Sequence, residues 1–231
     1  MSTLRHEVGV VIRVHDAAPY LVASIQSVLM RDPPAAEVVV VDDGSTDGSG
    51  LLAEAFVPRV RVIRQRRRGP GGAINAGLLL VRREFVAFQD ADDLWTPGRL
   101  GAMAAELAAR PEADGVMGRV EHFASEDLSA EEAARFDVPG TPQPGAALPS
   151  LLIRREVLDR VGCFDESLRA GEYLEWHDRA IRAGVRIEPI EVVCLRRRVH
   201  RTNTTRSAEA RRDYLRVARL AIARHRGQRS A

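Results

Sequence analysis

Short runs rich in β-branched residues alternate with helical patterns through the first half of this chain. Four such runs lie at residues 8–14, 37–41, 60–64 and 85–89, and a helical pattern follows each of the first three. Strands and helices that alternate at this spacing form βαβ units, in which a sheet is covered on both faces. We therefore predict an α/β fold of three layers, with a mostly parallel central sheet flanked by helices.

Local signals indicate where two of the helices begin. Asp16 is expected to cap the first helix, with Pro19 in its first turn. The glycine-rich turn Gly69–Gly72 opens another helix, which carries Asn75. This turn lacks the G-x-G-x-x-G and Walker patterns of phosphate-binding loops, so we interpret it as a flexible entry to the helix.

The second half of the chain is less regular. Residues 125–149 are rich in acidic residues, proline, glycine and alanine, which favours either a partly helical excursion or a mobile loop. Such a segment could be a lid over the acceptor or a disordered insertion. A helix over 172–183 and a strand over 185–193 are expected to follow. Trp95 and Trp176 could stack on a sugar ring, although a core position explains them more simply.

The charge of the chain is unevenly distributed. Residues 196–231 carry a formal charge of +10, whereas residues 1–195 carry −8. From about residue 207 to 225 the pattern is helical, with Tyr214 and Leu215 on an apolar arc and arginines opposite.

This asymmetry separates a body, residues 1–206, from an Arg-rich C-terminal helix or tail, residues 207–231. Such a tail fits an anionic membrane surface, a homodimer contact or the acidic body of its own chain, and we expect no nucleic-acid partner.

Several classes of protein are excluded by composition. All 34 basic residues among the 231 positions are arginines, which excludes Schiff-base chemistry, a Walker lysine and a lysine general base. Two cysteines are too few for a disulfide scaffold or a cysteine zinc site. The sequence has neither an apolar run of about 20 residues nor a signal-peptide core, so we predict a cytoplasmic protein, with the inner face of the membrane open to its tail.

Two acidic clusters follow two of the predicted strands. Asp42 and Asp43 come directly after the valines of the second strand, and Asp90, Asp92 and Asp93 come directly after the fourth. Ligands of parallel sheets bind beyond the carboxyl ends of the strands. Three carboxylates so close together repel one another unless a cation or several donors neutralise them, and Mg²⁺ and Mn²⁺ prefer such oxygen ligands. Each cluster, taken alone, is also compatible with a structural turn.

A series of motifs extends beyond these clusters. VVIRVHD, VVVVDDGSTDGS, GPGGAINAGL and FVAFQDADDLW are followed by GCFDESL and RRRVHRTN. In order and spacing, the series resembles the family 2 glycosyltransferases over about residues 6–205. The resemblance implies the A-type, Rossmann-like nucleotide-sugar fold, with a donor half at residues 1–123 and an acceptor half at residues 124–206.

The resemblance also implies roles in binding the sugar donor. Asp42 or Asp43 is expected to hydrogen-bond the nucleotide base, uracil by preference, with help from Arg13 and His15. Asp90 is expected to bind the ribose. These residues follow the order in which the family uses them along the sheet.

The sequence departs from the family at two of these places. The family motif Pro-x-Tyr-Asn is absent after the first strand, where Arg13 and His15 stand instead. Asn75 matches a donor-binding asparagine, but Ile74 replaces the arginine that commonly precedes it. The contacts to base and ribose are therefore left open.

A divalent cation is implied as the cofactor. Asp92 completes the DXD motif with Asp90 and is expected to hold Mn²⁺ or Mg²⁺ on the donor diphosphate. His200 occupies the place where related enzymes bring a late histidine to the metal or diphosphate, and a neutral imidazole suits Mn²⁺. From its spacing alone, His200 is better explained as a surface histidine in a basic segment.

The candidate catalytic base is a glutamate. The family's Glu-Asp pair reads Glu172–Tyr173 here, within the variant GEYLEW, and a tyrosine is a poor base near neutral pH. Glu172 lies at the expected start of a helix, and Glu175 shares its face. We therefore take Glu172 as the base, with Glu175 as helper or alternative, although two solvent-facing glutamates would give the same pattern.

The resemblance implies a metal-dependent, inverting glycosyltransferase of the hexosyl or N-acetylhexosaminyl class. It would move a sugar from a nucleoside-diphosphate sugar, expected to be UDP-linked, to the hydroxyl of an unknown acceptor. The alternatives are a nucleotide-sugar-binding protein without catalysis and a sugar-phosphate nucleotidyltransferase. The second is disfavoured because the chain has no lysine and no glycine-rich loop after the first strand.

Overall fold

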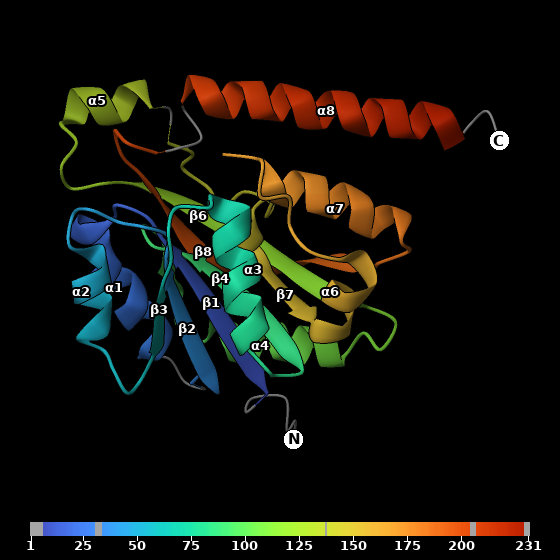
Figure 1. Cartoon of the computed structure of the whole chain (residues 1–231), viewed down its shortest axis with the longest axis horizontal. Coiled ribbons are helices and arrows are strands. Elements are labelled where there is room, and N and C mark those ends of the chain that lie inside the picture. The colour runs from blue at the N-terminus through green and yellow to red at the C-terminus, as the bar shows by residue number, and fades with distance from the viewer. Residues whose placement is uncertain (1–6, 31–33, 137, 204–206, 229–231) are drawn as a thin grey trace.

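The strands of the protein form one curled sheet. The computed structural model describes residues 7–30, 34–136, 138–203 and 207–228 (Figure 1). The strands within these residues are β1 (Val8–Val14), β2 (Glu37–Asp42), β3 (Arg61–Arg64), β4 (Phe85–Asp90), β5 (Leu94–Trp95), β6 (Gly115–Ala124), β7 (Leu151–Arg154) and β8 (Ile187–Val199). They lie in the order β3-β2-β1-β4-β7-β6-β8-β5. β1 to β4 are mutually parallel and β6 is parallel to β8, whereas β7 and β5 run against their neighbours.

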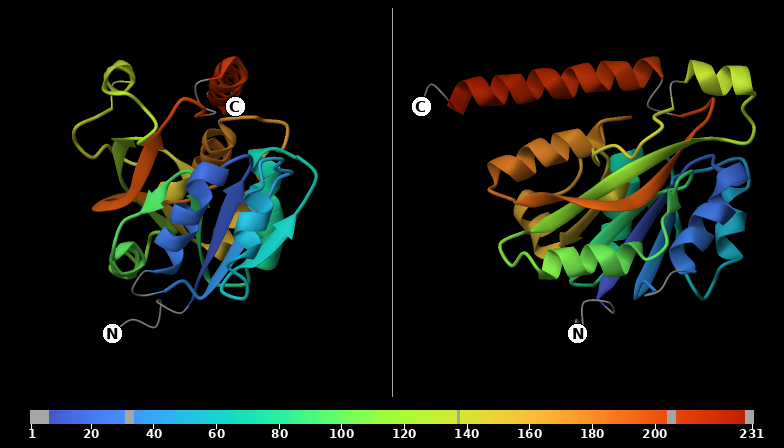
Figure 2. Two further views of the ribbon diagram at one scale, coloured as in Figure 1. Left: turned by 90° about the vertical axis from the view of Figure 1, so that its left-hand side faces the viewer. Right: turned by 180° about the vertical axis from the view of Figure 1, so that it is seen from behind.

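Helices cover both faces of the sheet (Figure 2). They are α1 (Ala18–Leu29), α2 (Ser49–Glu54), α3 (Pro70–Leu80), α4 (Arg99–Ala108), α5 (Ala130–Arg135), α6 (Arg155–Val161), α7 (Glu172–Arg182) and α8 (Ala208–Gln228), with a 3-10 turn at Leu148–Ser150.

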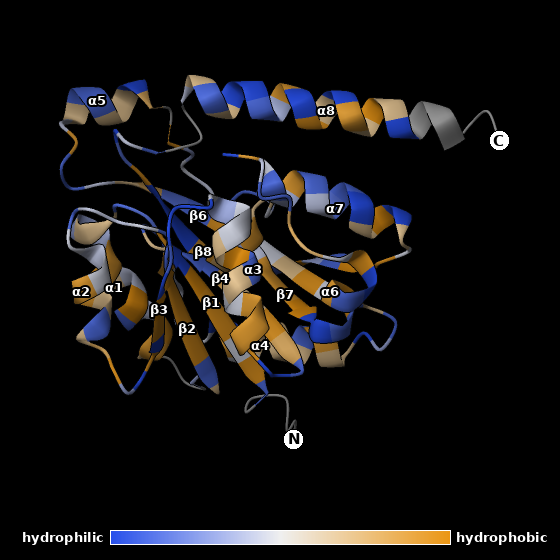
Figure 3. Cartoon of the chain, viewed as in Figure 1, coloured by the Kyte–Doolittle hydropathy of each residue, from blue (hydrophilic) through white to orange (hydrophobic). Residues whose placement is uncertain are grey.

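Alternate residues of each central strand belong to two separate cores. Val10 and Ile12 of β1 pack in the core that contains α1, α2 and α4, whereas Val11 packs in the core that contains α3, α6 and α7. Successive side chains of a strand point to opposite faces, so an almost uninterrupted run of valines fills both cores. The central strands are accordingly hydrophobic along most of their length (Figure 3). The predicted three-layer α/β fold is confirmed.

The predicted cap of the first helix is wrong. Asp16 has a positive φ of 47°, and α1 begins after Ala17, with no side-chain bond from its own N-cap. The loop after β2 supplies the cap instead, because Asp47 Oδ2 accepts the N–H of Ala18 at 2.8 Å. The Asp16 carboxylate in turn accepts the N–H of Thr46 at 2.7 Å. The two loops at this edge of the sheet therefore hold each other in place.

The excursion over residues 125–149 is partly helical, as predicted. Ser129 and Glu132 form a capping box at the start of α5, and Gln143 forms a bridge with Val120 of β6. β8 is longer than predicted, since it continues through three arginines to Val199 beside β6. The first part of the basic segment therefore belongs to the central sheet.

The basic helix α8 lies along the outside of α7 (Figures 1 and 2). Ala210 and Val217 of α8 are buried, and Val217 lies near Gly171, the residue before α7. Asp213 accepts the N–H of Arg169 at 2.6 Å, just before α7 begins. The inner face of α8 is thus packed on its own body. Within the described ranges, every helix is too short or too polar to span a bilayer.

Close packing of α3 on β1 gives a test of the fold. A Cβ at Gly77 would lie 2.4 Å from Cγ1 of Val11. Gly77→Ala is therefore expected to lower the free energy of unfolding by about 1–3 kcal/mol, because overpacking outweighs the gain in helix propensity. Urea unfolding followed by circular dichroism measures the change. Gly140→Ala is the control, since an added Cβ there meets nothing within 4 Å; equal stability of both variants would contradict this packing.

Candidate functional site

The two acidic clusters share one edge of the sheet. In the parallel register, Arg13 of β1 lies opposite Asp90 of β4, and Val14 lies opposite Asp42 of β2. In this register the last residues of β1, β2 and β4 lie within one position of one another. The two acidic clusters therefore lie at the same edge, as predicted from the sequence. It is the edge at which α/β sheets bind ligands.

Asp42 and Asp43 are buried and already bonded to protein donors. Asp42 Oδ1 accepts the N–H of Ser45 at 2.9 Å, and its Oδ2 accepts Arg64 Nε at 3.2 Å. Asp43 accepts the backbone N–H groups of Arg68 and Gly69, both at 2.8 Å.

The Asp43 carboxylate also accepts the side-chain amide of Gln65 at 2.7 Å. It thus fixes the loop 65–69 against the end of β2. A nucleotide base at Asp43 would have to replace one of these bonds or bind beside them.

Arg13 joins the sheet edge to α7. Its Nε donates to Asp90 Oδ1 at 2.5 Å and its Nη2 donates to Asp90 Oδ2 at 3.1 Å. Its Nη1 donates to Oε1 of Glu172, the first residue of α7. Although burial disfavours its charge, the carboxylates of Asp90 and Glu172 hold the pKa of Arg13 above its ordinary value. One guanidinium therefore bridges the predicted ribose-binding residue and the predicted base.

The structure brings Asp92 and His200 together. His200 Nε2 lies 2.9 Å from Asp92 Oδ2, and the His200 ring is buried against Tyr20, with ring centroids 4.6 Å apart. Burial acts to raise the pKa of Asp92, but the hydrogen bond and charge of His200 lower it below its ordinary value. Thr202 Oγ1 lies 2.9 Å from the other ring nitrogen and helps to fix the imidazole.

Three carboxylates of the second cluster could hold a cation. One oxygen each from Asp90, Asp92 and Asp93 lies within 4.8 Å of the others. Asp93, however, is buried and accepts the N–H of Arg198 at 2.9 Å. Burial and the charges of Asp92 and Asp90 raise the pKa of Asp93 well above its ordinary value. Asp90 is bonded to Arg13, whereas Asp92 lies beside His200, and these two residues could together hold Mn²⁺ or Mg²⁺.

The two candidate bases have different surroundings. Both are buried, but Glu172 faces Arg13, whereas Glu175 accepts Arg179 Nε at 3.0 Å and Arg224 Nη1 at 3.2 Å. Arg179 also donates to the carbonyl groups of the preceding loop. Glu175 therefore joins α7 to that loop and to α8. Tyr173 is buried in the core, and burial raises the pKa of its hydroxyl above its ordinary value, so it is no base.

His15 and Asn75, two of the predicted donor-binding residues, form hydrogen bonds to neighbouring loops. His15 Nδ1 lies 3.1 Å from the carbonyl oxygen of Asp43. Asn75 accepts the N–H of Phe164 at 2.9 Å and donates to Glu166 Oε1 at 3.0 Å. Asn75 thus ties α3 to the loop before α7, and no bond joins it to the Arg13 or Asp92 groups among the described residues. Its role toward a donor stays a prediction.

The similarity of the chain to known proteins agrees with this geometry. A family model described as glycosyl transferase family 2 matches residues 9–164. The chain belongs to this family. The match covers Asp42, Asp43, Asp90 and Asp92, and it ends before Glu172 and His200.

Similar family 2 proteins are found among bacteria. Succinoglycan biosynthesis protein ExoU of Rhizobium meliloti strain 1021 is 31% identical over 204 residues, which cover 80% of this chain and 59% of ExoU. Succinoglycan biosynthesis protein ExoO of the same strain is 42% identical over 99 residues, or 42% of this chain and 28% of ExoO. The chain thus spans at most about three fifths of the length of these relatives.

Solved structures share the fold of this family 2 chain. S. aureus TarS 1-349 in complex with UDP-GlcNAc superposes with a TM-score of 0.75 at 21% identity, covering 94% of this chain and 66% of that chain. The complex of TarS 1-349 with UDP gives a TM-score of 0.69. These likenesses establish the A-type fold predicted from the sequence.

Two residues at the site lie beyond the family match and were not predicted. The side chain of Arg197 in β8 makes no hydrogen bond or ion pair with the described residues, yet its charge lowers the pKa of Asp92. Tyr214 of α8 lies in contact range of Gly171, the residue before α7. Burial and the charge of Glu172 raise the pKa of Tyr214. Strand alternation could have singled out Arg197, the middle one of three consecutive arginines, but no local signal places Tyr214 at the site.

The loop anchored by Asp43 provides a test of this family 2 site. Asp43→Ala removes a buried carboxylate. The Gln65 amide and the N–H groups of Arg68 and Gly69 then lose their acceptor. We expect the free energy of unfolding to fall by about 2–3 kcal/mol, and proteolysis to cut within 65–69 first. Urea unfolding and limited trypsin digestion measure these effects. Glu54→Ala, which removes only an exposed ion pair of 3.8 Å, is the control; if the two variants behave alike, Asp43 does not anchor the loop.

Proposed function

We propose that this family 2 chain transfers a sugar from a nucleoside-diphosphate sugar to an acceptor hydroxyl, with inversion at the anomeric carbon. The observation that carries the proposal is the Arg13 bridge, which sets the candidate base Glu172 beside the predicted ribose-binding residue Asp90. A donor bound along the β1–β4 edge would thereby have its sugar near a buried carboxylate.

The donor is proposed to be UDP-linked. The related fold of TarS has been solved with UDP-GlcNAc and with UDP, which agrees with a hexosyl or N-acetylhexosaminyl donor here. Asp42 and Asp43 fix the end of β2 and the loop 65–69, and these elements would form the wall for the base. We propose that residues 1–123 hold this donor and residues 124–206 shape the acceptor cleft, with the helix from residue 207 as an addition.

Asp92 and His200 would hold a divalent cation. A carboxylate oxygen and an imidazole nitrogen that converge within hydrogen-bond distance suit Mn²⁺ well and Mg²⁺ less well. The cation, when bound, would offset the negative charge that develops on the departing diphosphate. Arg197 adds a cation on the same side, since its charge acts on both Asp92 and Asp93.

Glu172 is proposed as the general base. Arg13 donates to its Oε1, and among the described residues no donor occupies Oε2, which is free to accept a proton. Glu172 would take the proton of the acceptor hydroxyl as that oxygen forms a bond to the anomeric carbon. The bond from this carbon to the diphosphate breaks, and its electron pair leaves with the nucleotide. A single displacement needs no enzyme nucleophile. The Tyr173 hydroxyl, which could otherwise serve as one, is buried in the core.

Replacement of each glutamate should separate the two candidate bases. Glu172→Gln is expected to lower sugar transfer by about 10²–10⁴-fold, because the proton acceptor is lost while the shape is kept. Glu175→Gln should lower the melting temperature, because Arg179 loses its carboxylate partner and Arg224 keeps only Asp178, but it should keep most of the activity per folded molecule. Release of UDP from UDP-sugars, with and without an acceptor panel, is the measurement. Full activity in Glu172→Gln together with an inactive Glu175→Gln would reverse the assignment.

Thermal-shift measurements test the metal site without an acceptor. UDP with Mn²⁺, at about 100-fold above its dissociation constant, should raise the melting temperature by about 5 °C or more. Asp92→Asn and His200→Ala should lose the Mn²⁺-dependent part of the shift, whereas the exposed Glu54→Gln should retain it.

A Mn²⁺-dependent shift that survives in Asp92→Asn would exclude the proposed ligand set. Tight nucleotide binding without turnover on any acceptor would instead indicate a binding protein, and release of pyrophosphate from a nucleoside triphosphate and a sugar phosphate would indicate a nucleotidyltransferase.

A further inference from the structure

The outer face of α8 combines aliphatic and cationic side chains. Leu215 is 58% exposed and Ile222 is 53% exposed. These two residues are seven positions apart and therefore lie on the same side of the helix. Exposed arginines surround them at positions 211, 212, 216 and 219. α8 lies along the outer edge of the molecule, so this face points away from the body (Figures 1 and 3).

The opposite face of α8 fixes this orientation. Ala210 and Val217 are buried, Asp213 accepts the N–H of Arg169, and Arg224 pairs with Glu175. Asp213 of α8 and Glu175 of α7 are therefore engaged in these contacts and do not neutralise the outer arginines. Arg212 pairs with Glu209, but both side chains are more than half exposed, and such a pair contributes little.

Two of the remaining outer arginines have no ion pair in the described part of the chain. Among the described residues, no carboxylate lies within ion-pair distance of Arg211 or Arg219, whereas the charge of Arg216 acts on Asp165 in the loop before α7. An isologous contact with a second copy would set this positive face against itself. A nucleic acid would leave Leu215 and Ile222 against its charged backbone. A layer of anionic headgroups above an apolar interior suits both kinds of side chain at once.

We propose that the outer face of α8 docks on an anionic lipid surface. Leu215 and Ile222 enter the headgroup boundary, and the arginines around them contact lipid phosphates. Binding of this kind depends on salt, on anionic lipid and on the two aliphatic side chains together. It is independent of sugar transfer, so its test needs neither a donor nor an acceptor.

Vesicle flotation with the full chain tests the proposal. Vesicles of phosphatidylcholine alone are compared with vesicles in which about a quarter of the lipid is phosphatidylglycerol. The chain should float with the anionic vesicles and not with the neutral ones, and added salt should release it. Circular dichroism melts of every variant establish that it is folded.

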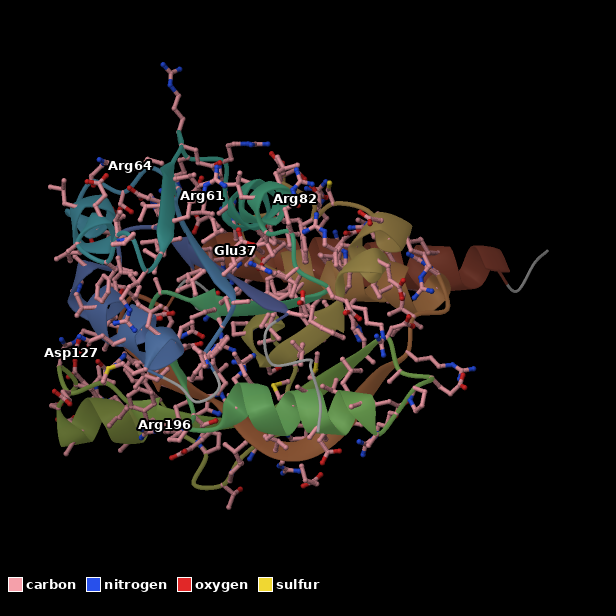
Figure 4. The ribbon with its side chains drawn as sticks, turned by 90° about the horizontal axis from the view of Figure 1, so that it is seen from below. Glu37, Arg61, Arg64, Arg82, Asp127 and Arg196 are labelled. Atoms are coloured by element: carbon pink, nitrogen blue, oxygen red, sulfur yellow. The ribbon has the colours of Figure 1, made fainter. Side chains whose placement is uncertain are left out.

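Paired variants test the two components of the face. Arg211→Gln with Arg219→Gln should lower the partition onto anionic vesicles by about tenfold or more. The control is Arg61→Gln with Arg186→Gln, which removes the same charge from exposed positions. Arg61, labelled in Figure 4, begins β3, which lies below α8 in Figure 1. This control should bind almost as the parent does.

The apolar component has its own control. Leu215→Ser with Ile222→Ser should lower the partition several-fold, whereas Leu51→Ser with Leu79→Ser should not, although Leu51 and Leu79 are 66% and 69% exposed.

Three results would overturn the proposal. The first is no flotation with anionic vesicles at low salt. The second is an equal loss of binding in the α8 variants and in their controls. The third is a concentration-dependent dimer, seen by analytical ultracentrifugation, that Leu215→Ser with Ile222→Ser abolishes, because a second copy would then cover this face.

Discussion

The guanidinium of Arg13 connects the two halves of the candidate site. It reaches Asp90 at the end of β4 and Glu172 at the start of α7, which are far apart in the sequence. Glu172 is buried and Asp90 is partly exposed beside it, so the cation between them offsets a repulsion and the desolvation of Glu172. The position of α7, and with it the position of the candidate base, therefore depends on a residue of the first strand.

Two departures from the family pattern meet at this bridge. Arg13 stands where the family usually has proline, and Tyr173 stands where it usually has the second acid. The structure shows why the second position has changed its role: the Tyr173 side chain is buried, and its hydroxyl lies 3.7 Å from Met117 Sδ. A carboxylate there would be buried in the apolar core. Glu172, in contrast, is turned toward Arg13 and the sheet edge.

Much of the fold followed from local patterns, because valine-rich strands and helices that alternate specify a parallel sheet whatever their exact contacts. The meeting of Asp42 and Asp43 with Asp90 and Asp92 followed from topology alone. The pairing of Asp92 with His200 came from the family resemblance. Contacts between distant segments could not be read in this way. The loop held by Asp43, the pairing of Glu175 with Arg224, and the cap that Asp47 supplies to α1 all depend on tertiary structure.

The orientation of the C-terminal helix α8 also depends on tertiary contacts that the sequence did not predict. Its apolar arc was predicted with the arginines opposite, but the structure turns Tyr214 inward toward Glu172 and leaves Leu215 outside. Exposed arginines at positions 211 and 219, each four residues from Leu215, lie on the same side as Leu215, so that part of the prediction is wrong. One helix, about 10 Å across, therefore lies between the candidate base and the outer face of α8. When that face docks on lipid, as proposed, a hydroxyl carried on the same lipid needs only a short tether to reach Glu172.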